Sequence, residues 1–199
     1  HERGMRIVGD LTLNHTGSGH EWFRKALADP DCVERKFYTW RSYPDDHVAW
    51  MGVPTLPKLD WASTDLRKRM IDGPDSVVGR WIGGTAGLDG WRIDVANQTG
   101  RYGADDLNLQ VARSVRATVT DRLGMDGALI AEHMHDPHDD LDVGGWQGVM
   151  NYAGFSRPVW TWLCDSENLI DYMGFGAGSY SHLTLSTKQA VLLCVCRRR

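Results

Sequence analysis

The stretch GLDGWRIDVANQTG, residues 87–100, places Arg92 and Asp94 two positions apart within an otherwise apolar run. Side chains alternate between the two faces of a strand, so both are predicted to point to the same face. An ion pair that points inward is costly unless it is well hydrogen-bonded or takes part in chemistry. The segment alone leaves two interpretations open: a structural salt bridge at a strand end, or a charged group with a chemical role.

A second carboxylate, Glu132, ends the next short apolar run, GALIAEH at 127–133. Neighbouring strands lie about 4.8 Å apart, so two carboxyl groups at their ends can lie about 5 Å apart, as in retaining glycosidases. Arg92 is expected to keep Asp94 charged, as a nucleophile requires. The apolar residues before Glu132 are expected to desolvate it, so that it keeps a proton for a leaving group. The opposing interpretation is two unrelated acids at strand ends.

The elements that must position these groups alternate between strands and helices, which predicts an α/β fold with a parallel sheet. Polar residues fall at the strands' carboxyl ends, where α/β enzymes carry their chemistry. Residues 31–60 have no regular period and are predicted to form an inserted functional segment. The predicted strands are 5–17, 88–96, 127–133 and 148–155, and the predicted helices are 19–30, 63–83 with a break at Gly73-Pro74, 107–124 and 156–165.

Composition narrows the class of protein. The net charge of -4 argues against nucleic acid as a partner, because phosphate binding favours a basic surface. The sequence holds no apolar run near the ~20 residues that a membrane helix needs, and no signal-peptide pattern. The four cysteines match neither a zinc ribbon nor a disulfide framework. We therefore expect a cytoplasmic globular protein.

Three segments in the same order resemble the first three signature regions of the α-amylase family, glycoside hydrolase family 13. They are DLTLNH at 10–15, GWRIDVAN at 90–97 and LIAEHMHD at 129–136. LPKLD at 56–60 is similar to a segment of the neopullulanase, cyclomaltodextrinase and maltogenic amylase subgroup, and Ala96-Asn97 also fits that subgroup.

The resemblance implies a partial TIM (β/α)8 barrel, with roughly strands three to six and an irregular inserted B domain after the third strand. Residues 1–15 and 61–180 would form the partial barrel, and 16–60 the B-domain-like insertion. The stretch 181–199 would be an atypical C-terminal tail. The chain is therefore expected to be a fragment of a longer enzyme.

The resemblance also implies roles for individual residues. Asp94 would be the nucleophile, Glu132 the general acid/base, and Arg92 the group that orients and ionises Asp94. His15 and His135 would bind substrate, an α-glucan or malto-oligosaccharide. Asn14 and Asp10 would be structural, and Asn14 would be a calcium ligand in the family's calcium-binding members; no cofactor is expected to be required. Aromatic residues within 37–61 are candidates for a sugar-stacking platform. No membrane partner is expected, and the oligomeric state is left open.

The sequence departs from the family pattern at two places. We find no histidine–aspartate pair after residue 140, where the fourth region would follow, so the chain alone is expected to be inactive. Gln98 stands where the subgroup often has glutamate. Two alternatives remain: a metal-dependent barrel hydrolase that uses His133 and His135, and a non-catalytic carbohydrate-binding protein.

Overall fold

The computed structural model describes residues 1–84 and 87–159, and every structural statement below refers to these residues. The predicted tail at 181–199 and most of the predicted helix at 156–165 lie outside them. Residues 157–159 are helical.

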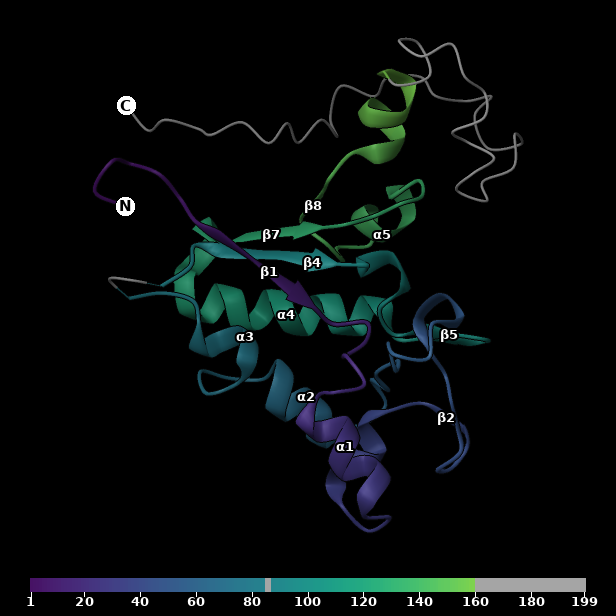
Figure 1. Cartoon of the computed structure of the whole chain (residues 1–199). Helices are drawn as coiled ribbons and strands as arrows, with labels where there is room; N and C mark the ends of the chain where they lie inside the picture. Colours follow the sequence, from purple (N-terminus) through teal and green to yellow (C-terminus); the bar gives the residue numbers. More distant parts are fainter. Residues whose placement is uncertain (85–86, 160–199) are drawn as a thin grey trace.

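A four-stranded parallel sheet forms the centre of the molecule, as the sequence predicts (Figure 1). Its order is β1-β4-β7-β8, so each strand pairs with the next one along the chain that joins this sheet. In the register of β1 and β4, Thr12 lies opposite Asp94. The strands are β1 (Val8–Thr12), β4 (Gly90–Asp94), β7 (Ala128–Ala131) and β8 (Gly148–Val149).

The inner strand β4 has one apolar face and one polar face. Trp91 and Ile93 are buried in the hydrophobic core, while the alternate residues Arg92 and Asp94 remain partly exposed. Gly90 begins the strand because β7 approaches closely there: a Cβ at this position would lie 2.1 Å from the carbonyl oxygen of Ala128. One face of β4 therefore builds the core and leaves the other face for polar groups.

Helices follow the strands, and Figure 1 shows α2, α3 and α4 on one side of the sheet. The long helix α4 buries a stripe of small and β-branched residues against the core. The hydroxyls of Ser63 and Ser76 cap α2 and α3 by accepting hydrogen bonds from backbone N–H groups. The helices are α1 (Glu21–Ala28), α2 (Thr64–Met70), α3 (Val77–Arg80), α4 (Asn108–Leu123) and α5 (His138–Asp142).

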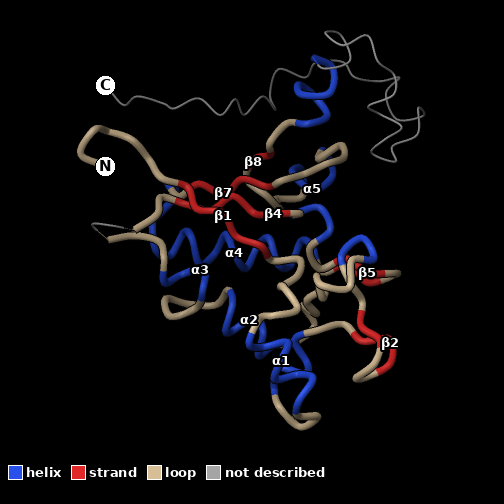
Figure 2. The backbone as a smooth tube through the Cα atoms, viewed as in Figure 1, coloured by secondary structure: helices blue, strands red, loops and turns tan. Residues whose placement is uncertain are grey.

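The segment between β1 and α2 is mostly loop apart from α1, as Figure 2 shows. It packs an aromatic cluster in which Phe23 contacts Tyr38, Trp40 and His47. Its short elements are the 3-10 helices η1 (Val33–Phe37) and η2 (Trp50–Gly52), and the antiparallel pair β2 (Trp40–Ser42) and β3 (Asp46–His47).

Further short elements follow the sheet strands. They are η3 (Ala96–Gln98), the antiparallel pair β5 (Arg101–Tyr102) and β6 (Asp105–Asp106), η4 (Gly124–Asp126) and the π-helix η5 (Tyr152–Ser156).

All four predicted strands end earlier than the sequence indicates: the strand predicted at 5–17 ends at Thr12, and the strand predicted at 127–133 ends at Ala131. The strand predicted at 88–96 ends at Asp94, because Val95 turns into the left-handed region with φ of 47°. The strand predicted at 148–155 is wrong after Val149. Asn151 is also left-handed, with φ of 32°, and caps the π-helix η5 with its side chain.

Candidate active site

One guanidinium, that of Arg92, joins side chains from all four strands of the parallel sheet or from directly after them. Its Nη1 donates to Asp94 Oδ1 at 2.7 Å and to the two carboxylate oxygens of Asp10 at 2.8 and 3.0 Å. Its Nη2 lies 3.0 Å from Glu132 Oε1, and its Nε lies 3.3 Å from Met150 Sδ. We call these five residues the Arg92 cluster.

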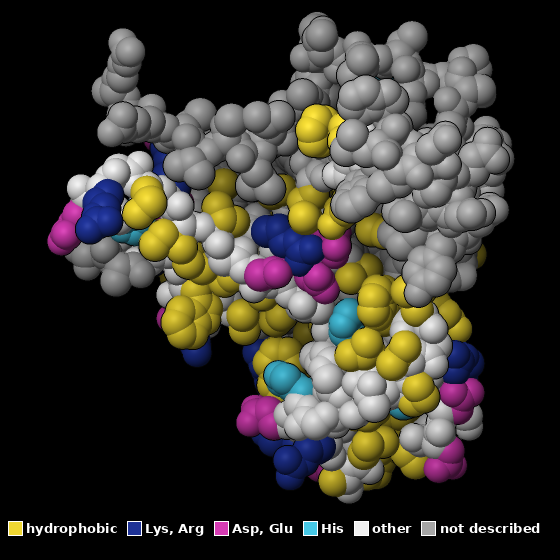
Figure 3. All heavy atoms as spheres, turned by 45° about the horizontal axis from the view of Figure 1, so that its top comes forward, with side chains coloured by type: hydrophobic (Ala, Val, Ile, Leu, Met, Phe, Trp, Pro, Cys, Tyr) yellow, Lys and Arg dark blue, Asp and Glu magenta, His cyan; other side chains and the backbone are white. Residues whose placement is uncertain are grey.

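The cluster confirms that Arg92 and Asp94 share a strand face and form an ion pair. The side chains of Arg92, Asp94 and Glu132 are 21%, 27% and 17% exposed. Burial opposes the charge on Arg92, but hydrogen bonds to Asp10 and Asp94 outweigh it and hold the pKa of Arg92 above its ordinary value. Figure 3 shows basic side chains lying against acidic ones on this face, with hydrophobic side chains around them.

Glu132 has a second donor, the backbone N–H of Val95, which lies 2.8 Å from Oε2. Val95 directly follows Asp94 and is buried in a left-handed conformation, which is strained for a β-branched residue. Strain of this kind typically costs about 1–3 kcal/mol and persists where the surrounding structure demands it. The turn at Val95 thus ends β4 and aims an N–H at the neighbouring carboxylate.

The sequence predicts desolvation of Glu132 by the apolar run before it. In the structure both of its side-chain oxygens face donors, Oε1 the guanidinium of Arg92 and Oε2 the backbone N–H of Val95. Arg92 lies on β4, the strand that pairs with β7, and spacing along the chain does not reveal this contact. The protonation expected for Glu132 stays a prediction.

Asn14 and His15 lie two and three residues beyond the end of β1. Asn14 is fully buried, and its Oδ1 accepts a hydrogen bond from the ammonium of Lys58. Lys58 Nζ also donates to the backbone carbonyl of Gln98 at 2.9 Å. The oxygen that a calcium ion would take from Asn14 therefore already faces a cation. The residues present do not fit a calcium ion ligated by Asn14.

His15 is held between Asn14 and an aromatic ring. Asn14 Nδ2 lies 3.2 Å from His15 Nδ1, and the imidazole stacks on Trp50 with ring centroids 5.2 Å apart and planes at 17°. Burial lowers the pKa of His15, Asp94 opposes this, and Lys58 adds to it. Among the aromatic residues of 37–61, the structure singles out Trp50 as the one beside His15.

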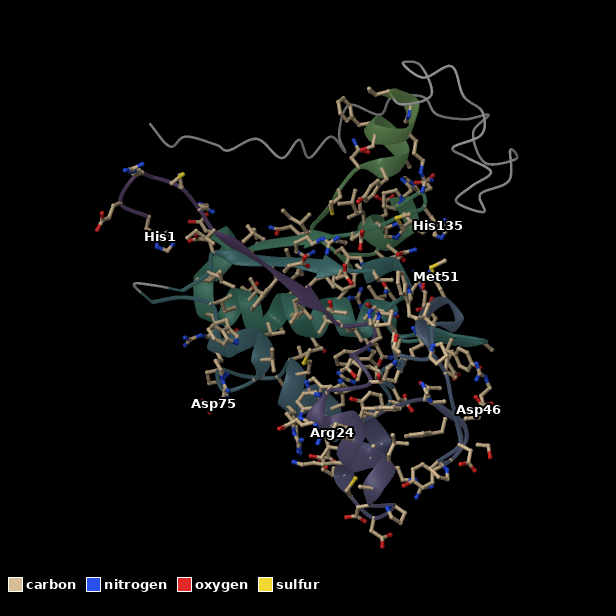
Figure 4. The ribbon with its side chains drawn as sticks, viewed as in Figure 1. His1, Arg24, Asp46, Met51, Asp75 and His135 are labelled. Atoms are coloured by element: carbon tan, nitrogen blue, oxygen red, sulfur yellow. The ribbon has the colours of Figure 1, made fainter. Side chains whose placement is uncertain are left out.

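The two histidines after β7 have different surroundings. Buried His133 faces Asp140 Oδ2 with Nε2 at 2.8 Å and the carbonyl of His135 with Nδ1 at 3.2 Å. Asp140 also pairs with both terminal nitrogens of Arg101. His135 is exposed, and Figure 4 shows it with Met51 toward the end of the molecule where β4 and β7 end.

The metal alternative based on His133 and His135 gains no support, since both ring nitrogens of His133 face oxygens. Within 1–84 and 87–159 no group of three or more His, Cys, Asp or Glu side chains could hold a metal ion.

Sequence reasoning missed three parts of the site. Lys58 was quoted within LPKLD but given no role, and the N–H of Val95 has no sequence signal. Tyr152 lies near the Arg92 cluster: burial raises its pKa, and the negative charge of Glu132 raises it further. The sequence predicted a strand for the segment that contains Tyr152, and this prediction gave no sign that Tyr152 lies near Glu132.

The comparisons with known proteins agree with this geometry. A family model described as "Alpha amylase, catalytic domain" matches residues 1–143, so the chain belongs to the α-amylase family and is part of an α/β barrel. Members of this family similar to the chain are named glucosidases and amylases.

Two curated relatives illustrate the match. Glucan 1,6-alpha-glucosidase of Streptococcus dysgalactiae subsp. equisimilis is 30% identical over 118 residues, which cover 50% of this chain and 21% of the relative. Intracellular maltogenic amylase of Bacillus subtilis (strain 168) is 26% identical over 196 residues, covering 96% of this chain and 30% of the relative. The chain thus spans less than a third of the length of either.

A solved structure is similar to this chain in both fold and sequence. Cyclic alpha-maltosyl-(1→6)-maltose hydrolase from Arthrobacter globiformis matches with a TM-score of 0.64 and 27% identity, covering 77% of this chain and 33% of that one.

Among the helices of the described residues, none combines the length and apolar character required to span a membrane.

Proposed function

We propose that the protein carrying this chain cleaves α-glucosidic bonds of malto-oligosaccharides or related α-glucans with retention of configuration. Asp94 is the nucleophile, Glu132 the general acid/base, and His15 and His135 bind substrate. The observation that carries the proposal is the guanidinium of Arg92, which binds both carboxylates at the ends of neighbouring parallel strands. Relatives named for glucosidase and amylase activity support the substrate class.

In the first step Asp94 attacks the anomeric carbon while Glu132 donates a proton to the departing oxygen. A covalent glycosyl-enzyme forms and the glycosidic bond breaks. Water then attacks the anomeric carbon, gives a proton to Glu132 and releases Asp94. Glu132 donates a proton in the first step and accepts one in the second, while Arg92 and the N–H of Val95 contact its two oxygens.

Azide separates the two carboxylate roles. Asp94→Gly is expected to lose turnover of p-nitrophenyl α-glucoside, and azide is expected to restore it by forming β-glucosyl azide. Glu132→Ala is expected to form α-glucosyl azide, because azide then attacks the glycosyl-enzyme. Asp10→Gly is the matched control, since it removes another carboxylate from Arg92 but is expected to form no glucosyl azide.

Other outcomes would favour the alternatives. Activity that a chelator abolishes and Asp94→Asn leaves intact would support the metal-dependent hydrolase. Sugar binding without turnover would support a non-catalytic binding protein. The same assay on the 199-residue chain tests its expected inactivity, which robust turnover would contradict.

A further inference from the structure

Lys58, Asn14 and His15 form a chain of hydrogen bonds that leads from the inserted segment to the site. Lys58 is 6% exposed and Asn14 is fully buried, so solvent does not compete for their contacts. The Lys58 ammonium donates to Asn14 Oδ1 and to the carbonyl of Gln98. The amide nitrogen of Asn14 then lies on the other side, 3.2 Å from His15 Nδ1.

The chemistry of these groups fixes the direction of each hydrogen bond. A lysine ammonium has three donors and no acceptor, so the Asn14 atom that it contacts must be the carbonyl oxygen. The remaining amide group of Asn14 is an NH2, which only donates. His15 Nδ1 must therefore offer a lone pair, and a neutral ring then carries its proton on Nε2.

The backbone keeps the three residues in this relation. His15 and Lys58 form an antiparallel β-bridge, and the backbone N–H of Leu59 donates to the carbonyl of Asn14 at 3.0 Å. Stacking on Trp50 limits rotation of the imidazole. The charged groups that act on His15 are Asp94 and Lys58, and burial outweighs the opposing effect of Asp94 on its pKa.

We propose that Lys58 is a positioning residue that acts through Asn14 to hold His15 as the neutral Nε2–H tautomer. His15 then presents a fixed N–H donor, suited to a hydroxyl oxygen of the sugar. The assignment of the tautomer depends only on the hydrogen bonds above, whereas its use toward the sugar rests on the proposed function.

The test is nitrogen NMR of histidine-labelled protein carrying this chain, at about pH 7, where most ordinary imidazole rings are neutral. His15→Gln assigns the signal. We expect an unprotonated Nδ1 and a protonated Nε2 for His15. A proton on Nδ1 in the unsubstituted protein would overturn the proposal.

Asn14→Asp replaces the amide group with a carboxylate of nearly the same shape. A carboxylate can still accept from Lys58, but it cannot donate to His15, so His15 Nδ1 is expected to gain a proton. Lys58→Met is expected to give a mixture of tautomers and a higher pKa for His15, and Lys58→Arg to restore the Nε2–H form. An unchanged His15 signal in Lys58→Met would refute the role of Lys58, and an unchanged signal in Asn14→Asp would refute the role of Asn14.

A matched control separates positioning from general destabilisation. Trp61 Nε1 donates to the carbonyl of Leu13, one residue before Asn14, at 2.8 Å. Trp61→Phe is expected to lower the melting temperature while leaving the tautomer of His15 unchanged. Turnover of the α-glucoside is measured separately: the expected tautomer without turnover contradicts the proposed function alone, and turnover with the Nδ1–H form contradicts this inference alone.

Discussion

The burial of the Lys58 ammonium gives a pH dependence of stability whose sign can be worked out. Burial lowers the pKa of Lys58 from 10.5 to about 8. Between these two values the unfolded chain holds a proton that the folded chain has lost, so the free energy of unfolding rises with pH. The penalty for burying the charge is complete below about pH 8 and disappears as the pH approaches the unfolded value.

The magnitude follows from the size of the shift. Each pKa unit corresponds to about 1.36 kcal/mol, so the penalty amounts to about 3 kcal/mol at neutral pH. From about pH 7 to about pH 10, roughly 2.5 kcal/mol of it is removed. Lys58→Met has no titrating group at this position in either state. The free energy of unfolding of the unsubstituted chain, minus that of Lys58→Met, should rise by this amount.

Urea denaturation of both chains at the two pH values measures this difference. Groups shared by both chains cancel in the subtraction, among them Tyr38, whose pKa burial raises to about 12. Lys68→Met is the matched control, because Lys68 is exposed on α2. The free energy of unfolding of the unsubstituted chain, minus that of Lys68→Met, should be the same at both pH values. A flat or falling difference for Lys58→Met would refute the reasoning.

Three other predictions follow from the site. Arg92→Lys should lower kcat on the α-glucoside by on the order of 100-fold, because one ammonium cannot hold both carboxylates in place; a change in KM alone would contradict this. Asp140→Asn should lower the free energy of unfolding by about 2 kcal/mol at neutral pH. Burial raises the pKa of Asp140, but the hydrogen bonds from Arg101 and His133 outweigh this effect and hold the pKa below its ordinary value. In urea denaturation, the difference in free energy of unfolding between the unsubstituted chain and Asp140→Asn should therefore vanish as acid protonates this group. A chelator or millimolar calcium should shift the melting temperature by less than about 2 °C; a larger rise with calcium would mean that an ion does bind.

The hydrophobic pattern was enough to find the sheet. Apolar runs separated by helical spacing predicted parallel strands in the right order, and the two-residue spacing predicted that Arg92 and Asp94 share a face. These features depend on residues near one another in the chain, where periodicity carries information. Strand ends were less predictable, because Val95 is a typical strand residue that tertiary contacts hold in a left-handed turn.

The parts that could not be predicted are contacts between distant segments. Lys58 meets Asn14 across 44 positions, and Arg92 meets Met150 across 58. No local pattern encodes such pairs, and the same holds for the contact between Glu132 and Arg92 on the neighbouring strand. The residue types of the site were thus readable in the sequence, while the distant residues that contact them were not.

The Arg92 cluster also has a consequence for the order of folding events. Its contacts reach residues of, or directly after, β1, β4, β7 and β8, and two of the residue pairs, Asp10–Arg92 and Arg92–Met150, span more than fifty positions along the chain. Loops of this length close late, since their entropy must be lost before the contact forms. We therefore expect the cluster to assemble after the strands have paired. Arg92 substitutions should then speed unfolding far more than they slow refolding, so this arginine sets how long the assembled sheet lasts.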